Sequence, residues 1–374
     1  MRVAIVTESF LPHVNGVTNS VLRVLEHLAD RGHAALVLAP GADPDVYAGA
    51  TVVRTPSASL NPLIDLALGL PAPGLEQRLR AWRPDVVHLA SPVALAAQGA
   101  RVARRLGVPT VAVYQTDLAG FARRYGLAAT SPLLERWLRH VHRRADLTLA
   151  PTATVAEQLR RRGVPRVRLW SRGVDGWRFS PERRDPQWRA RHVAAGELLV
   201  GYVGRLAPEK RVHLLEALRG LGGCRLVVVG DGPVRGRLEA RLPEATFVGF
   251  LEGDDLSRAV ASLDVFVHTG PHETFCQAAQ EALSSGVPVV APDAGGIAEL
   301  VDEGRNGLRW TADDPAALRE AVATLVARPA LRAALAERAR PSVAHRSWSA
   351  VGDQLIAHYR SVACWRVLEE EQVA

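Results

Sequence analysis

Short apolar segments alternate with amphipathic stretches along both halves of the chain. In the first half, the segments rich in Val, Ile, Leu and Ala are residues 2–7, 34–39, 51–55, 85–90, 110–114, 147–150 and 167–170. In the second half they are residues 198–204, 225–230, 246–250, 264–269 and 287–292. Continuous apolar runs separated by helical patterns are typical of parallel strands that are buried on both faces. The pattern therefore predicts an α/β protein with two doubly wound, Rossmann-like sheets.

The spacing between these segments predicts where the chain divides. Residues 16–33, GVTNSVLRVLEHLADRGH, form the clearest helix, with apolar positions at helical spacing and a glycine stop. Residues 171–188 are rich in Gly and Pro without a period, so we expect the interdomain linker there. A chain of 374 residues is too long for one ordinary core, which favours two domains, 1–172 and 173–346. We expect a last helix, about 347–374, to pack back on the first domain.

Two such domains are expected to face each other across a deep cleft lined by the carboxyl ends of their strands, where doubly wound sheets bind ligands. The sequence VGRLAPEKR places Arg205 and Lys210 in one loop directly after the strand 198–204. A guanidinium and an ammonium at the end of a strand suit a diphosphate. An ordinary surface loop with two cations is the alternative interpretation of this segment taken alone.

The sequence HETFCQAAQE places two carboxylates, Glu273 and Glu281, on either side of a predicted helix start. We expect a helix over residues 275–284 that is capped by Thr274, with free N–H groups that favour anions. Eight residues of helix separate the carboxylates by about 12 Å, which is too far for an acid/base pair. The spacing suits two ends of one long ligand, with a sugar at Glu273 and the backbone of residues 275–277, and a ribose at Glu281. A capped helix with two solvated acids is the alternative.

Polar residues near two strand ends of the first half offer weaker signals. Asn15 and Gly16 precede the first helix, and Gly16 could let the backbone approach a phosphate or a sugar closely. Gln115 and Asp117 follow the strand 110–114, and Asp117 suits either an acceptor site or a helix cap. The GxGxxG of a dinucleotide fold is missing from the amino-terminal strand–helix turn.

The sequence predicts no metal site. Asp43 and Asp45 form the only DxD, in a loop rich in Gly and Pro that we interpret as a turn. His140 and His142 are two apart on a predicted helix and point to different faces. The three cysteines are widely spaced with no CxxC, which argues against a zinc site or a disulfide framework.

The charge of the chain is uneven. Residues 1–172 contain 22 Lys and Arg against 12 Asp and Glu, whereas the remainder contains 24 against 27. The first half is either an ordinary arginine-rich surface or attracted to an anionic membrane. We predict no nucleic-acid partner, because no basic-aromatic recognition motif accompanies the charge. The amino terminus is typical of a strand and not a signal peptide, and no run matches a membrane span, so we expect a cytoplasmic protein, peripheral on the inner face of the plasma membrane if the charge attracts lipid.

Three of these segments together resemble a known family. VGRLAPEK, HETFCQAAQEALSSGVPVVAPDAGG and ESFLPHVNGVTNSV resemble the family 4 retaining glycosyltransferases of the GT-B fold, and the likeness covers nearly the whole chain. VYQTDLAGFARRYG and DVVHLASP are similar to the actinobacterial GDP-mannose-dependent α-mannosyltransferases that act on glycolipid acceptors. The resemblance implies that no divalent metal or other cofactor is required, and that a nucleotide-diphosphate sugar is the donor substrate.

The resemblance also implies roles for individual residues. Arg205 and Lys210 would hold the donor diphosphate, and Asp117 would lie near the acceptor. The other implied donor contacts are Gly16 near the phosphates, Glu273 with the backbone of Phe275, Cys276 and Gln277 around the hexose, Glu281 at the ribose, and Phe250, Asp254 and Asp255 near the base. A carboxylate at the base could accept from the paired N–H donors of guanine, which favours GDP over UDP.

The sequence departs from the family at two positions. Gln115 stands where many relatives have His, so no catalytic histidine is carried over, and Cys276 stands where many have Gly. We predict retaining transfer of a hexose, mannose from GDP-mannose, to a glycolipid or small glycosidic acceptor. A UDP-sugar-dependent transferase of the same fold, a non-hydrolysing nucleotide-sugar epimerase and a non-catalytic sugar-nucleotide or membrane-binding protein are the alternatives.

Overall fold

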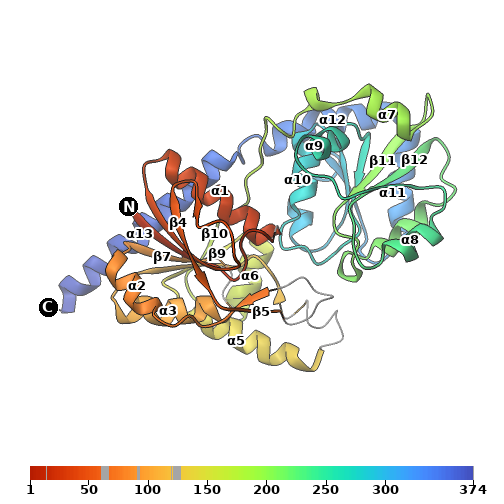
Figure 1. Cartoon of the computed structure of the whole chain (residues 1–374). Helices are drawn as coiled ribbons and strands as arrows, with labels where there is room; N and C mark the ends of the chain where they lie inside the picture. The colour runs from red at the N-terminus through yellow and green to blue at the C-terminus, as the bar shows by residue number, and fades with distance from the viewer. Residues whose placement is uncertain (14, 60–66, 91–92, 119, 121–127, 374) are drawn as a thin grey trace. The chain divides into compact units, whose positions relative to one another are not determined.

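The computed structural model describes residues 1–13, 15–59, 67–90, 93–118, 120 and 128–373 (Figure 1). The chain divides into two compact units. Unit 1 comprises Met1–Ser171 and Trp348–Ala374, and unit 2 comprises Arg172–Ser347. The boundary predicted from the sequence lies one residue further along the chain.

Unit 1 contains an eight-stranded sheet with the order β10-β9-β8-β7-β1-β2-β4-β3. Its strands are β1 (Arg2–Val6), β2 (Ala34–Pro40), β3 (Val46–Tyr47), β4 (Ala50–Thr55), β7 (Val86–Leu89), β8 (Thr110–Val113), β9 (Leu147–Ala150) and β10 (Val167–Leu169). The strands are parallel except for the antiparallel pair β3 and β4. Separately, β5 (Ser57–Ser59) pairs antiparallel with β6 (Ala67–Gly69). The strand order reverses at β1, between β2 and β7.

The helices of unit 1 cover both faces of this sheet. They are α1 (Gly16–Asp30), α2 (Leu75–Trp82), α3 (Leu95–Arg105), η1 (Ala128–Thr130), α5 (Ser131–Arg144), α6 (Ala153–Arg161) and α13 (Trp348–Val373). Side chains alternate across a strand, so Val3 and Ile5 of β1 pack with α1 and α13. Ala4 and Val6 pack on the other face with α2 and α3. The uninterrupted apolar run of β1 is explained by this double burial.

Helix α13 belongs to unit 1 although it follows unit 2 in the chain. Trp170 donates its indole N–H to the carbonyl of Val351 on α13, at 2.9 Å. The Tyr359 hydroxyl lies 2.6 Å from Nδ1 of His88, and both side chains are buried. Burial lowers the pKa of His88 to about 3, so its neutral ring accepts the hydroxyl proton. The carboxyl-terminal helix is therefore locked to β7 and β10 by polar contacts as well as by packing.

Unit 2 contains a fully parallel six-stranded sheet with the order β13-β12-β11-β14-β15-β16. Its strands are β11 (Leu198–Val203), β12 (Cys224–Val229), β13 (Thr246–Gly249), β14 (Val265–Val267), β15 (Val289–Pro292) and β16 (Gly307–Trp310). The strand order reverses at β11, which lies between β12 and β14. The prediction of two doubly wound parallel sheets is confirmed.

The helices of unit 2 also lie on both faces of their sheet. They are η2 (Pro181–Arg183), α7 (Pro186–His192), η3 (Pro208–Lys210), η4 (Val212–Leu218), α8 (Arg235–Arg241), α9 (Gly253–Ala261), α10 (Gln277–Ser284), η5 (Gly296–Glu299), α11 (Pro315–Ala327) and α12 (Pro329–Val343). Leu199 of β11 packs with α9, α10 and α12, whereas Val200 packs with η4, α8 and α11. The alternation along β11 again assigns one core to each face.

The interdomain linker predicted over residues 171–188 is wrong for most of its length. Val174 and Phe179 are buried in the core of unit 2. Two side chains of α10 hold the same segment: Gln280 donates to the carbonyl of Arg172 at 3.0 Å, and Ser284 donates to the carbonyl of Phe179 at 2.7 Å. The Gly and Pro content marks an irregular backbone, which here is packed and hydrogen-bonded.

Candidate functional site

The candidate site lies where the strand order of unit 2 reverses. Parallel sheets bind ligands at the carboxyl ends of the strands beside such a reversal. The chain leaves β11 into the loop that contains Arg205 and Lys210, and it leaves β14 into the loop that begins with His268. Thr269 donates its hydroxyl to the carbonyl of Lys210 at 2.7 Å, which ties the two loops together.

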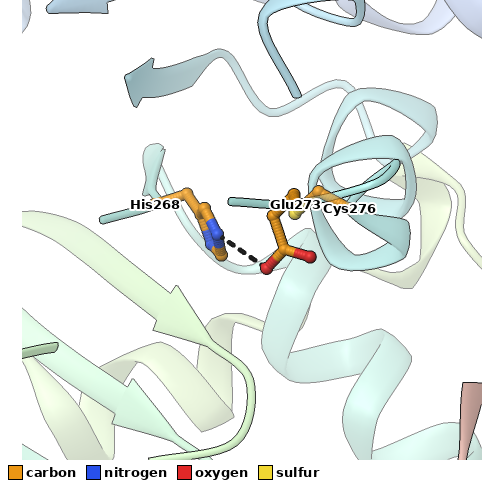
Figure 2. A group of neighbouring side chains, drawn as sticks. All are labelled: His268, Glu273 and Cys276. Carbon is orange, nitrogen blue, oxygen red and sulfur yellow. Dashed lines mark ion pairs between the residues drawn. The ribbon is translucent and has the colours of Figure 1, made fainter. Parts of the chain in front are cut away.

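Glu273 is the centre of a charged cluster at this edge. Its Oε1 accepts from the ammonium of Lys210 at 2.6 Å and lies 3.1 Å from Nε2 of His268 (Figure 2). The side chains are largely buried, with exposed fractions of 15% for Glu273, 27% for Lys210 and 3% for His268. The structure thus brings Lys210 and Glu273, which were both predicted from the sequence, into direct contact.

The cluster fixes the charge of each of its members. Burial would raise the pKa of Glu273, but Lys210 and His268 hold that pKa far below its usual range. Burial opposes the charge of Lys210, and Glu273 still raises the Lys210 pKa. Burial would also lower the pKa of His268, yet Cys276 and Glu273 raise it to about 9. At neutral pH Glu273 is therefore a carboxylate that contacts two cations, Lys210 and His268.

The glycine-rich loop after β15 positions the loop of Glu273. A Cβ added to Gly296 would lie 2.2 Å from the carbonyl oxygen of Thr274, and one added to Gly295 would lie 2.5 Å from that of Pro271. The backbone N–H of Gly296 donates to the carbonyl of Glu273 at 2.6 Å. Only glycine allows the two backbones to approach this closely, so these two residues fix the position from which Glu273 extends.

Helix α10 begins two residues later than predicted. Its N-cap is Cys276, with φ 78 and no side-chain capping bond, so the prediction that Thr274 caps the helix is wrong. Phe275 is instead buried in the core at 2% exposure, which holds the entry to the helix out of helical geometry. The φ of Cys276 lies in the left-handed region that favours glycine. The side chain of Cys276 does not cap the first N–H groups of α10.

Two other predicted donor residues of unit 2 are exposed. Arg205 is exposed, and none of the residues that the structure describes forms an ion pair with it. Tyr202 fixes its backbone by donating to the Arg205 carbonyl at 3.2 Å. Phe250 directly follows β13 and is 68% exposed, which is unusual for a phenyl ring. The acids predicted beside the base, Asp254 and Asp255, are exposed in the first turn of α9.

The remaining two predicted positions of unit 2 lie on α10. Gln277 donates its side-chain amide to the carbonyl of Gly173 at 3.0 Å, so that amide has a structural partner while its backbone N–H stays at the helix start. Glu281 is half-buried in the middle of the helix.

In unit 1 the side chains at or beside the predicted positions form hydrogen bonds with other residues of the same unit. Gly16 is the first residue of α1, where Asn15 caps the helix by accepting from the N–H groups of Val17 and Thr18. Asp117 accepts from the N–H of Gly120 at 3.2 Å, which is the bond of a helix cap, and from the Tyr114 hydroxyl at 3.2 Å. Gln115 donates to the carbonyl of Ala90 at 3.0 Å. Residues 121–127, which include the arginines of FARRYG, lie outside the described residues.

Two buried ionisable residues were missed by the sequence reasoning, namely His268 and Glu8. Oε1 of Glu8 accepts from the N–H of Ala96 at 3.0 Å and of Val93 at 3.2 Å, at the start of α3. Burial raises the pKa of Glu8 to about 7 despite these bonds. Both residues directly follow apolar strand segments beside a reversal of strand order, and that position is the signal that could have found them.

The fold matches those of solved structures. The computed structure aligns with crystal structures of Anabaena HepE in complex with UDP, at a TM-score of 0.78 and 21% identity over 96% of this chain and 100% of that one. It aligns equally well with sucrose-phosphate synthase from Thermosynechococcus elongatus, at a TM-score of 0.78 and 21% identity over 96% and 98%. The two Rossmann-like units are the two domains of a GT-B glycosyltransferase fold.

Sequence comparison specifies the family. Residues 14–178 match the model for Glycosyltransferase Family 4, and residues 197–328 match the model for Glycosyl transferases group 1. The chain is 51% identical to the GDP-mannose-dependent alpha-mannosyltransferase of Mycobacterium tuberculosis (strain CDC 1551 / Oshkosh), over 97% of each chain. It is 45% identical to the enzyme of the same name from Corynebacterium glutamicum, over 97% of this chain and 89% of that one. The chain belongs to glycosyltransferase family 4.

The length and apolar character of each helix decide whether it could cross a membrane. Among the described residues, none of the helices has the length and apolar character that a bilayer crossing requires.

Proposed function

We propose that this enzyme transfers mannose from GDP-mannose, with retention of configuration, to a glycolipid or small glycosidic acceptor. The observation that carries the proposal is the paired Glu273, a buried carboxylate that Lys210 holds ionised at the edge of a nucleotide-binding type of sheet. The identity of 51% to an enzyme named for GDP-mannose and for α-mannosyl transfer supports the choice of donor.

The arrangement suits a nucleotide-diphosphate sugar laid along the sheet edge of unit 2. Oε1 of Glu273 is engaged by Lys210, which leaves Oε2 to accept from a sugar hydroxyl. The uncapped N–H groups at the start of α10, together with Lys210 and Arg205, face the diphosphate as hydrogen-bond donors and cations. The exposed ring of Phe250 offers a stacking surface to the base. Glu281, further along α10, accepts from the ribose hydroxyls.

These groups support the reaction by stabilising the leaving group. The bond between C1 of mannose and the diphosphate oxygen breaks, and the departing GDP gains negative charge that fixed cations and helix N–H groups stabilise. The acceptor hydroxyl forms its bond to C1 on the same face of the sugar, and its proton passes to a diphosphate oxygen. The cluster supplies positive charge from Lys210 and His268, so the step is proposed to proceed without a divalent metal.

A donor screen tests this function. The enzyme is treated with excess chelator, and nucleotide release from GDP-mannose is measured with and without an alkyl α-mannoside or a bacterial lipid extract. We expect release of GDP that depends on the acceptor, and a product with α-configured mannose by NMR. UDP-glucose and ADP-glucose should be turned over at least about a hundredfold more slowly, because the base contacts discriminate.

The same screen distinguishes the alternatives. Conversion of a UDP-sugar in the absence of any acceptor would identify an epimerase, and preferred turnover of a UDP-sugar with acceptor would overturn the choice of GDP-mannose. Tight binding of GDP-mannose without turnover under all acceptors would identify a binding protein.

A further inference from the structure

Three side chains that commonly bind metals gather beside the start of α10. The imidazole of His268, the carboxylate of Glu273 and the thiol of Cys276 each place one ligand atom within 4.8 Å of the others (Figure 2). We propose that this cluster binds a zinc ion. We further infer that zinc bound there blocks the donor sugar and inhibits transfer, and this second inference rests on the proposed function.

The imidazole of His268 is buried beside the other two side chains of the cluster. The ring is 3% exposed, and Nε2 forms an ion pair with Oε1 of Glu273 at 3.1 Å. Neither ring nitrogen meets hydrogen-bond geometry with any of the described residues. A metal ion bound between the three side chains would give one ring nitrogen a well-directed partner.

The ring of His268 is held in place from three sides. It stacks on Tyr202 with a centroid distance of 5.9 Å and on Phe266 with one of 6.4 Å, at angles of 10° and 4°. Gly270 lies against its edge, because a Cβ there would be 3.1 Å from Nε2. The imidazole of His268 is therefore oriented before any ion binds, which reduces the conformational entropy lost on metal binding.

The thiol of Cys276 is also fixed. Its residue is 7% exposed and takes a left-handed φ of 78, an unfavourable conformation for a residue with a Cβ. The sulfur makes no capping bond to α10, although it occupies the N-cap position. Because Gly295 and Gly296 hold the loop before Cys276, the thiol, the carboxylate and the imidazole are positioned by one short, braced segment, residues 268–276.

The ligand set favours zinc. Cysteine, histidine and a carboxylate are its usual protein ligands, and three of them leave a fourth position open. Lys210 occupies Oε1 of Glu273, so the ion would take Oε2.

Cobalt(II) is the probe for this site, because it substitutes for zinc and reports a thiolate ligand by a charge-transfer absorption band. Protein freed of metal by chelation and dialysis is titrated with cobalt chloride and then with zinc chloride. We expect one cobalt per chain, a thiolate-to-cobalt band, and displacement by zinc. Failure to develop the band, or cobalt bound with no thiolate signal, would overturn the site.

Cys276→Gly is the decisive variant, since glycine adopts the φ of this position and the fold should be retained. It should lose the band and weaken zinc binding by more than about tenfold, the least that loss of a ligand should cost. Cys364→Ser removes an exposed thiol of unit 1 and should change neither. A band that persists in Cys276→Gly and disappears in Cys364→Ser would show that the thiolate ligand is Cys364 and refute the proposal.

Inhibition is tested separately from binding. In the wild-type enzyme, zinc should suppress mannosyl transfer, and added chelator should restore it. GDP-mannose should in turn diminish the cobalt band, because both ligands need Glu273. Absence of any transfer from GDP-mannose would refute the proposed function and leave the cobalt result standing. Full transfer with zinc bound would refute the inhibition alone.

Discussion

Two buried glutamates, one in each unit, lie beyond the carboxyl ends of strands at or next to the reversal of strand order, and they differ in charge. Glu8 follows β1, where the strand order of unit 1 reverses, and Glu273 follows β14, the neighbour of β11, where that of unit 2 reverses. Two cations contact Glu273 and lower its pKa. Among the described residues, only backbone N–H groups donate hydrogen bonds to Glu8, and burial raises its pKa to about 7.

The difference shows what a buried carboxylate needs in order to stay ionised. Backbone N–H groups lower the pKa of Glu8 too little to offset its burial, whereas Lys210 and His268 outweigh the burial of Glu273. Under the proposed function, the fixed negative charge of Glu273 binds a sugar hydroxyl. Glu8 instead accepts from backbone N–H groups at the start of α3.

Removing the charge of Glu273 should produce the largest effect. Glu273→Gln keeps the shape of the side chain but leaves Lys210 and His268 without their anion. We expect kcat for transfer from GDP-mannose to fall by about 10²–10³-fold, the usual loss for one electrostatic group in a site. GDP itself should still bind within about threefold of wild type by calorimetry, since GDP has no sugar.

The matched control is Glu239→Gln, which breaks a surface pair with Arg235 on α8. Surface pairs contribute little, so turnover should remain at the wild-type level. If Glu273→Gln also keeps wild-type turnover, the negative charge of Glu273, which distinguishes it from Glu8, does not contribute to catalysis.

The titration of Glu8 should be visible in the stability of unit 1. Its folded pKa of about 7 exceeds the ordinary value of 4.5, so the folded state binds more protons between these values. Stability should be full below about pH 4.5 and should fall as the pH rises through 7, by up to about 3 kcal/mol. Glu8→Gln should remove this loss and be the more stable protein at pH 8.

Denaturant unfolding at pH 5 and pH 8, followed by circular dichroism, measures the effect. Asp30→Asn, at the exposed end of α1, should keep the wild-type pH dependence. Equal pH dependence in wild type and Glu8→Gln would show that Glu8 does not titrate as described.

The two glutamates also show what the sequence could and could not predict. Glu273 was found because it precedes a helix and sits in a recognisable motif. Its contact with Lys210 requires knowledge that β14 lies next to β11, a non-local pairing that no local pattern records. Its second partner, His268, lies in the same loop after β14 and was missed because it falls inside the apolar segment predicted over residues 264–269. The protonation of Glu8 depends on burial by α3, which is equally non-local.

The fold itself was largely predictable from local pattern. Strands such as β1 and β12 are long apolar runs buried on both faces, so they stand out in the sequence. The strand β16, GLRW, was missed because its pairing to β15 leaves Arg309 exposed and interrupts the apolar run. The start of α10 was misplaced because burial of Phe275 and the φ of Cys276 are set by tertiary packing and not by capping preference.

Arg205 tests whether the charge of the unit 2 site extends beyond the buried cluster. It is exposed, so its loss should disturb no core contact. We expect Arg205→Ala to weaken GDP binding by about tenfold in calorimetry, the typical value of one charged hydrogen bond. Arg211→Ala, in the same loop, removes a cation that pairs with Asp313 and should leave GDP affinity unchanged. Equal affinity in wild type and Arg205→Ala would confine the diphosphate site to Lys210 and the helix start.

The smallest expected effect concerns the charge of unit 1, which exceeds that of unit 2. Helix α5 presents exposed Arg136 and Arg139 beside Leu133, which is 69% exposed, and Trp137, which is 37% exposed. Basic and apolar side chains on one exposed helix face are typical of binding to an anionic bilayer surface.

We expect co-sedimentation with vesicles of phosphatidylglycerol and phosphatidylcholine at low salt. Binding should be about fivefold weaker for Arg139→Gln, since each basic group contributes about 1 kcal/mol near the lipid. Arg219→Gln, an exposed cation of unit 2, is the matched control and should bind like wild type. Equal sedimentation with neutral vesicles, or no loss at high salt, would show that the charge difference between the units does not direct the protein to a membrane.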